Sequence, residues 1–263
     1  MAKKSARVVA VANEKGGVGK TAMVVNLGAA IVKAGKTVLI VDMDPQHNAT
    51  IGVGVDVTDE MVSIYDLISD DGDANASVDD AICSTRWAGL DVLGSHPDLA
   101  GAEVELVDAE ERENRLKHVI DPLKARYDVI ILDTPPSLSL LTINVFACAN
   151  EVLVPCQTHP YAFNALADLF DTINEVRAEI NPNLQIRGLV PTFYDQRYRV
   201  CRDIMDRLKS DDRYRNLIFN TVIRSNVTIA ASADAGKPVV FYRTGSFGAK
   251  DYTSLAQEFL MAK

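Results

Sequence analysis

The sequence predicts an α/β fold with a doubly wound, mostly parallel sheet flanked by helices. The first observation behind this prediction is that continuous apolar runs alternate with helical patterns from one end of the chain to the other. The second is that the apolar run Val8–Ala12 leads directly into a glycine-rich loop, which an alanine-rich helical segment follows. The third is size, because 263 residues, of which 48% are hydrophobic, can bury one substantial core. Since the chain has no repeat or linker, we expect residues 1–263 to form a single domain.

The strands and helices follow from these patterns in chain order. Strands covered by helices on both faces read as continuous apolar runs. We expect them at Val8–Asn13, Thr37–Asp42, Leu90–Leu93, Val129–Asp133, Val152–Gln157, Ile186–Thr192 and Phe219–Ile223. Helices are expected at Ala22–Lys33, Glu110–Ala125, Ala162–Ile180, Arg199–Lys209 and Tyr252–Met261. The acidic segment Asp56–Ser84 is expected to be irregular, with an exposed turn at residues 70–73.

The glycine-rich loop predicts phosphate binding. Glu14 stands where the pattern G-x-x-x-x-G-K-[ST] has its first glycine, but the chemistry of the loop is kept. Successive backbone N–H groups can wrap phosphates, and the following helix directs its positive end at them. Lys20 can reach the β- and γ-phosphates, and the Thr21 hydroxyl can ligate Mg²⁺. The residues assigned to the nucleotide are Lys15, Gly16, Gly17, Val18, Gly19, Lys20, Thr21 and Ala22. The alternative is a chance glycine turn before a helix.

A second lysine, Lys15, stands at the mouth of the same loop. Its side chain is not expected to fold back onto phosphates that Lys20 already holds. It is better placed to reach a nucleotide on a second subunit, so the sequence predicts an active dimer.

Two further strands end in carboxylates. The second strand ends in Val41–Gln46, which contains Asp44, and the strand Val129–Asp133 closes four apolar residues on Asp133. Ligands of open parallel sheets bind at the carboxyl ends of the strands, so these groups should face the phosphate loop. A carboxylate of the first pair, Asp42 or Asp44, can order the attacking water or hold a water of Mg²⁺, and Asp133 can act on the Mg²⁺ side, usually through a water. Each motif alone could be an ordinary strand-end turn.

Charge and cysteine content limit the other classes of function. The formal net charge of −9 excludes a chain coated in positive potential, so nucleic acid must be contacted by a local patch. Cys83, Cys148, Cys156 and Cys201 lack C-x-x-C spacing, which predicts reduced thiols in a cytoplasmic protein. Met1–Arg7 has no apolar core, so no signal peptide is expected. No apolar stretch approaches the ~20 residues of a membrane helix, so we expect no membrane contact.

Three strings together resemble one family. Asn13–Thr21, Val41–Asn48 (VDMDPQHN) and Asp133–Leu141 (DTPPSLSLL) are similar to the ParA/Soj partition ATPases of the ParA/MinD superfamily. Further matches are His96–Leu106, Leu141–Ala147 and Gly236–Pro238, so the resemblance runs from Arg7 to the final helix. It implies a phosphate-loop NTPase of the deviant Walker-A type.

The resemblance also implies a function. Its members are cytoplasmic, nucleoid-associated ATPases that use ATP and Mg²⁺ and form a nucleotide-sandwich homodimer. The dimer binds DNA non-specifically when ATP is bound, and a ParB-like partner stimulates hydrolysis. In this sequence Lys15 resembles the signature lysine that acts across the dimer, Lys20 the phosphate lysine and Thr21 the Mg²⁺ ligand. Asp44 resembles the residue that orients the hydrolytic water, and Asp133 the Walker-B aspartate.

Related branches differ at particular residues. The nitrogenase iron-protein type needs a cysteine just after the Walker-B strand, where this chain has Thr134–Pro136. The MinD type ends in a basic amphipathic helix that binds membrane. Here the terminal segment Ser254–Lys263 carries only one lysine, which predicts a helix docked on the protein.

For DNA contact, the resemblance points to Arg197, which follows a Tyr-Asp pair, and to Arg224. Where relatives read Ile-Pro-Arg-Asn-Val-Arg, this chain has Ile223–Thr228, with Arg224 in place of the proline that often lies near adenine. Arg224 therefore serves either the adenine or the DNA surface. Arg199 and Arg202 could begin a basic stripe, although Asp203 and Asp206 also permit a solvated helix with internal ion pairs.

The sequence alone does not determine which cargo the protein positions. Chromosome or plasmid positioning is the first prediction. One alternative is a positioning ATPase for a non-DNA cargo, such as a chemoreceptor cluster or an organelle. The other is a nucleotide-dependent regulatory switch with little turnover.

Overall fold

A seven-stranded sheet forms the centre of the computed structural model, which describes residues 5–73, 75–159 and 162–261. The strands lie in the order β3-β4-β2-β5-β1-β6-β7 and are parallel except for the edge strand β3, which runs antiparallel to β4. Their bounds are β1 Arg7–Val11, β2 Val38–Asp42, β3 Ile82–Ser84, β4 Leu90–Leu93, β5 Val129–Asp133, β6 Glu151–Gln157 and β7 Gln185–Thr192. This arrangement confirms the predicted doubly wound, mostly parallel sheet.

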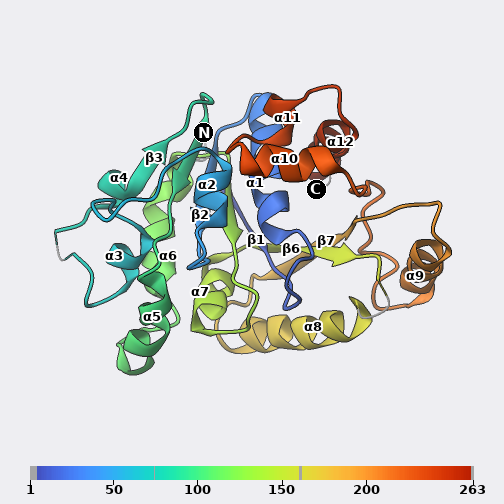
Figure 1. Ribbon diagram of the computed structural model, residues 1–263. Helices are drawn as coiled ribbons and strands as arrows, with labels where there is room; N and C mark the ends of the chain where they lie inside the picture. Colours follow the sequence, from blue (N-terminus) through green and yellow to red (C-terminus); the bar gives the residue numbers. More distant parts are fainter. Residues whose placement is uncertain (1–4, 74, 160–161, 262–263) are drawn as a thin grey trace.

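Helices cover both faces of the sheet (Figure 1). One face carries α1 (Lys20–Lys33), α2 (Asn48–Gly52), α10 (Val227–Asp234), α11 (Val239–Tyr242) and α12 (Phe247–Met261). The other carries α3 (Ile64–Ile68), α5 (Leu99–Glu105), α6 (Arg115–Ile120), α7 (Leu140–Cys148), α8 (Ala162–Glu179) and α9 (Arg199–Ser210). The short α4 (Val78–Ala81) precedes β3, and the 3₁₀ turns η1 (Leu106–Asp108) and η2 (Asp121–Ala125) extend α5 and α6.

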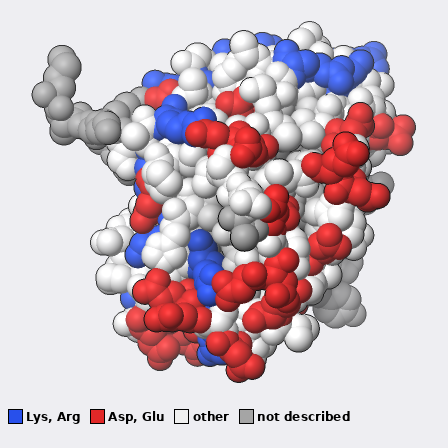
Figure 2. Space-filling model, turned by 90° about the vertical axis from the view of Figure 1, so that its left-hand side faces the viewer, with Lys and Arg blue, Asp and Glu red and all other residues white. Residues whose placement is uncertain are grey.

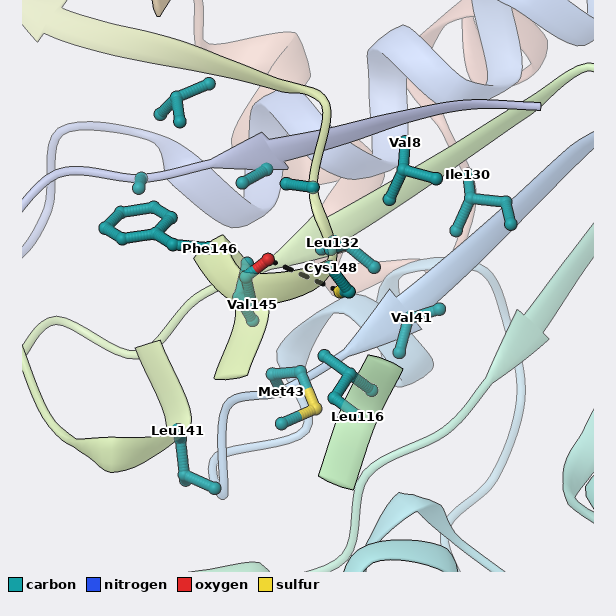
Figure 3. Packing of buried hydrophobic residues seen from close by; sticks show 14 of the residues in the cluster. Val8, Val41, Met43, Leu116, Ile130, Leu132, Leu141, Val145, Phe146 and Cys148 are labelled. Atoms are coloured by element: carbon teal, nitrogen blue, oxygen red, sulfur yellow. Dashed lines mark hydrogen bonds between the residues drawn. The ribbon is translucent and has the colours of Figure 1, made fainter. Parts of the chain in front are cut away.

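The sheet separates two hydrophobic cores because successive side chains of a strand point to opposite faces. In β1, Val8 belongs to the core beneath α7, whereas Val9 belongs to the core beneath α1. Figure 3 shows part of the first core, which includes Val8, Ile130 and Leu132 from the strands and Phe146 from α7. All four of these side chains are fully buried.

The prediction of a strand at Phe219–Ile223 was wrong. The segment runs beside β7, with the Phe219 N–H donating to the Leu189 carbonyl at 2.9 Å, but the bridges to its neighbours are isolated ones at the flanking residues Ile218 and Arg224. The reason is a competing acceptor on α12, because consecutive N–H groups of Asn220 and Thr221 donate to the Glu258 carboxylate at 2.7 and 2.8 Å. The outermost strand of the sheet on the other side is β3, which lies in a segment expected to be irregular.

Two helix predictions also needed correction. The helix expected over Glu110–Ala125 is regular only in α6, because Pro122 supplies no N–H and the chain continues as the 3₁₀ turn η2. The supposedly irregular region contains α3, whose start is fixed by reciprocal hydrogen bonds between Ser63 and Asp66. That S-x-x-D pattern was present in the sequence and could have predicted the helix.

The C-terminal helix α12 is docked on the protein, as predicted. Its Leu255 and Phe259 are fully buried in the core shared with α1. The Arg7 guanidinium lies 4.1 Å from the centroid of the Phe259 ring. Across the described ranges, we find no helix whose length and apolar character would let it cross a membrane. The cysteines, all within those ranges, are free thiols.

Candidate nucleotide-binding site

The glycine-rich loop joins the end of β1 to the start of α1. Gly17 and Gly19 have φ angles of 74° and 92°, a left-handed conformation that glycine adopts without the steric cost of a side chain. Gly16 and Gly17 face open space, since a Cβ atom added at either would meet nothing within 4 Å. No side chain caps the start of α1 at Gly19. The first N–H groups of α1 are therefore available to an anion.

Two side chains hold this loop in place, one just after β1 and one at the end of β7. The buried Asn13 amide donates to the Pro155 carbonyl at 2.8 Å, and its oxygen accepts from the Lys15 N–H at 3.0 Å. The Thr192 hydroxyl donates to the Val18 carbonyl at 2.9 Å. Sequence reasoning missed Asn13, although an asparagine whose oxygen binds the N–H two residues on is a known turn pattern.

Two carboxylates end adjacent strands beside the loop. Asp42 of β2 and Asp133 of β5 are register partners, and Asp133 is also the register partner of Val11 in β1. Asp42 and Asp133 are fully buried, and Lys20 is only 7% exposed. Both oxygens of the Asp133 carboxylate lack a hydrogen-bond partner among the described residues. The Thr21 hydroxyl lies close to this carboxylate and acts to lower its pKa, although the two groups do not meet in ordinary hydrogen-bond geometry.

Burial disfavours the charges of this cluster. It raises the pKa of Asp133 well above its usual value, and the neighbouring Asp42 carboxylate raises it further. Burial also lowers the pKa of Lys20, an effect that the carboxylates of Asp133 and Asp44 partly offset. Unpaired buried oxygens and a buried ammonium together suit a site that receives both a divalent cation and an anion.

Asp42 has a structural role in this arrangement. Its Oδ2 accepts from the N–H and from the hydroxyl of Thr50, each at 2.8 Å, which ties the end of β2 to α2. Burial raises the pKa of Asp42 to about 6, against the opposing effect of those hydrogen bonds. The other oxygen, Oδ1, accepts from the Asp44 N–H at 3.2 Å. Asp44 itself is 8% exposed, and its Oδ1 accepts from the Gln46 N–H at 3.0 Å.

Lys15 lies within its own chain in this structure. Its Nζ donates to Oε1 of Gln157, at the end of β6, at 3.1 Å. Next to it, Oε1 of Glu14 is buried without a hydrogen-bond partner among the described residues. Burial, and secondarily the Asp168 carboxylate, raises the pKa of Glu14. No local sequence signal predicted Gln157, because it is distant in the chain.

The two arginines proposed for DNA contact line one groove of about 720 Å³. Each already has an acidic partner. The Arg224 Nε donates to the Asp251 Oδ2 at 3.0 Å, and its guanidinium lies 4.3 Å from the centroid of the Phe247 ring. The Arg197 Nη2 lies 2.6 Å from the Asp195 Oδ2. Arg197 is far more accessible, because its side chain is 82% exposed and that of Arg224 is 41% exposed.

The possible basic stripe on α9 is interrupted by an ion pair. The Arg199 Nε lies 3.5 Å from the Asp203 Oδ2, one helical turn away. The Arg202 guanidinium instead donates to the Arg197 carbonyl at 3.3 Å. At Arg199 the structure therefore agrees with the alternative interpretation, a solvated helix with internal ion pairs, and not with a continuous basic stripe.

The fold and the loop together define a phosphate-loop nucleotide-binding protein. A model of the AAA domain family matches residues 6–186. The chain is 41% identical to sporulation initiation inhibitor protein Soj from Bacillus subtilis over 252 residues, covering 96% of this chain and 97% of Soj. It is 36% identical to the chromosome partitioning protein ParA of Myxococcus xanthus, covering 97% and 88% of the two chains. The chain belongs to the ParA/Soj-type partition ATPase family.

Solved structures agree with this assignment. Cobyrinic acid a,c-diamide synthase from Mycobacterium smegmatis, with bound ADP and magnesium, is 34% identical with a TM-score of 0.83, over 97% of this chain and 94% of the other. A putative plasmid partition protein from Borrelia burgdorferi, bound to AMPPNP, is 25% identical with a TM-score of 0.78. That match covers 97% of this chain and 98% of the Borrelia chain.

Proposed function

We propose that this protein binds and hydrolyses ATP to position a chromosome or a plasmid. The observation that carries this proposal is the meeting of Lys20, Thr21 and Asp133 at one end of the sheet, beside an uncapped helix N-terminus. The unpartnered oxygens of Asp133 fit a site that is completed by a ligand. The ADP and magnesium of the mycobacterial structure, and the AMPPNP of the Borrelia structure, support ATP and Mg²⁺ as the ligands here.

Each residue then has a part in binding. The loop N–H groups and the first turn of α1 surround the phosphates, and the Lys20 ammonium reaches their outer oxygens. The Thr21 hydroxyl and, through water, the Asp133 carboxylate would hold the magnesium ion, which supplies charge neutralisation on the phosphate oxygens when bound. Phosphoryl transfer needs positioning and charge stabilisation more than a strong base.

Hydrolysis requires two further residues. Asp44, on the turn after β2, orients the attacking water, because its carboxylate keeps free acceptor capacity beyond its bond from Gln46. Lys15 leaves Gln157 and contacts the phosphates of the opposite subunit, so ATP closes a homodimer. This step makes dimerisation dependent on nucleotide.

The closed dimer is proposed to bind non-specific DNA through local basic patches, with Arg197 and Arg224 as candidates. A ParB-like partner would then trigger hydrolysis and release. In this cycle the protein is cytoplasmic and associated with the nucleoid. A non-DNA cargo carried by the same cycle is the alternative for what is positioned.

A second candidate function is a nucleotide-dependent regulatory switch with little turnover. The name of the Bacillus relative, sporulation initiation inhibitor protein, favours it. In that case ATP binding would change a regulatory contact, and hydrolysis would only reset the switch slowly.

One experiment separates these functions. The ATPase rate of the full chain is measured alone, with non-specific DNA, and with DNA plus a ParB-like protein. Partition predicts a low basal rate that DNA and the ParB-like protein raise together. A rate that neither addition changes contradicts partition and favours the switch.

A further inference from the structure

A groove of about 410 Å³ with many apolar lining residues lies between α5 with η1 on one side and α7 with α8 on the other. These helices gather at the lower edge of the molecule in Figure 1. Val107 of η1 is 50% exposed and Leu138 is 37% exposed on its walls. Further apolar lining residues are Leu140 and Ile143 of α7, the buried Val176 of α8, and Ile180, which directly follows α8. Figure 3 shows Leu141, Val145 and Phe146 of α7 among the core residues, so α7 presents apolar residues both to the core and to this groove.

Acidic side chains form the rim of the groove. Glu175 and Glu179 lie one turn apart on α8, both exposed, and Glu103 of α5 lines the same groove. None of these three carboxylates has an ion pair with another described residue. Arg112, the cation among the described lining residues, is already engaged, since its Nε lies 2.8 Å from the Glu113 Oε1. The groove therefore combines exposed apolar surface with uncompensated negative charge.

The charge of the surroundings decides which occupant fits. Figure 2 shows acidic side chains gathered over the adjoining side of the molecule, which includes β3, α3 and α4. A second copy of this acidic chain, with a net charge of −9, would bring like charges together at the rim. A cationic amphipathic segment would bury its apolar side on the groove while its charges meet the glutamates.

The groove also reaches the loop that follows Asp133. Leu138 and Ser139 line it, and the Thr142 hydroxyl of α7 donates to the Ser137 carbonyl at 2.7 Å, which holds this loop on the helix. At the other end of the loop, the Thr134 hydroxyl donates to the Val11 carbonyl at 2.9 Å, beside the phosphate loop. An occupant of the groove thus contacts the segment that connects directly to Asp133.

We propose that the groove between α5, α7 and α8 is the docking site for a cationic amphipathic segment of a partner protein. That this partner is the one that triggers hydrolysis rests on the proposed function. The docking itself depends only on the groove and its rim.

The test uses a fluorescein-labelled amphipathic peptide of leucine and lysine at helical spacing, and a matched peptide with glutamate in place of lysine. Binding to the full chain with MgATP is followed by fluorescence anisotropy. We expect the lysine peptide to bind, more weakly as salt increases, and the glutamate peptide not to bind. The double variant Glu175→Lys/Glu179→Lys should weaken binding on the order of tenfold, because two favourable pairs become repulsive.

Two controls locate the effect. Asp59→Lys/Glu60→Lys makes the same change in net charge at exposed positions outside the groove, and should change affinity less than about twofold. Val107→Ser should weaken binding without any change in charge. Hydrogen exchange should slow at residues 138–143 and 172–180 when the lysine peptide is added. Equal weakening in the Asp59/Glu60 control, equal binding of the glutamate peptide, or no binding of the lysine peptide would overturn the proposal.

The same samples are tested for binding of a fluorescent ATP analogue. Absence of that binding in the wild-type chain would contradict the proposed function and leave the peptide result to be judged separately. If the chain binds the ATP analogue and the groove variants bind the lysine peptide as tightly as the wild type does, only the docking proposal is overturned.

Discussion

Asp42 and Asp133 stand side by side as register partners at the carboxyl ends of β2 and β5, and neither side chain is exposed to solvent. Thr50 donates hydrogen bonds to the Asp42 carboxylate, whereas both oxygens of Asp133 lack a partner among the described residues. Two adjacent buried carboxylates disfavour each other's ionisation. The nucleotide site is therefore built at a cost to the stability of the ligand-free protein.

This pair predicts a pH dependence of stability. Burial raises the pKa of Asp42 from 3.8 to about 6, so the folded state binds this proton more tightly than the unfolded state. The stabilising protonated form is present at low pH and is lost as the pH rises through about 6. Asp42→Asn mimics that form, so its stability relative to wild type should increase by up to about 3 kcal/mol between about pH 3 and about pH 7, most steeply between the two pKa values of 3.8 and about 6.

Urea unfolding without magnesium or nucleotide measures this difference. Asp70→Asn is a suitable control, because Asp70 lies on an exposed turn and pairs with Arg115. Parallel stability profiles for wild type and Asp42→Asn would show that burial does not disfavour the Asp42 charge.

The second prediction concerns Lys15 and dimerisation. Lys15 is held by Gln157 in the single chain and makes no contribution to the phosphate grip of its own subunit in the proposed cycle. Lys15→Gln should therefore leave nucleotide binding by the monomer nearly intact and abolish ATP-dependent dimerisation. Light scattering with ATP and with ADP measures the association.

Lys33→Gln provides the matched control, since it removes one positive charge at the exposed end of α1. It should dimerise like wild type. A Lys15→Gln protein that also dimerises with ATP would refute the role of Lys15 across the interface.

The part of the site that could be predicted from the sequence is the part that is local. Lys20 and Thr21 begin α1 after the loop that follows β1, Asp133 is the last residue of β5, and parallel strands bring their carboxyl ends to the same edge. Gln157 holds Lys15 from 142 residues away, and no periodicity encodes such a contact. Competition between distant groups caused the main error in the fold. Glu258 on α12 accepts from the Thr221 N–H, which lies between the two N–H groups, of Phe219 and Ile223, that do bond to β7.

The third prediction separates ATP binding from hydrolysis. Asp44 lies on the turn after β2 and is proposed to position the attacking water rather than to grip the phosphates. Asp44→Ala should lower the hydrolysis rate by about 10²–10⁴-fold and leave an ATP-bound dimer that persists. Single-turnover hydrolysis and light scattering on the same sample measure the two effects. Hydrolysis at the wild-type rate would reduce Asp44 to a turn residue.

The last prediction tests DNA binding. Because the chain is acidic overall, DNA affinity should depend on ATP-driven pairing of two local basic patches, one from each subunit. Binding should be absent with ADP, insensitive to sequence and strongly reduced by salt, because each neutralised phosphate releases counterions. Electrophoretic mobility shifts at two salt concentrations, with ATP and with ADP, measure this dependence.

Arg197 and Arg224, which line the groove of about 720 Å³, should contribute unequally to DNA binding. Arg197→Gln should weaken binding and reduce the salt slope by about 1 for each phosphate that Arg197 neutralises, because its side chain is largely exposed. Arg224→Gln should have the smaller effect, since Asp251 and the Phe247 ring already hold its guanidinium. Arg126→Gln is the control, because Arg126 is also an exposed arginine paired with an aspartate, Asp79, but lies outside the groove. Equal retention with ATP and ADP, or equal weakening by Arg126→Gln, would contradict a nucleotide-gated DNA surface at this groove and favour the regulatory switch.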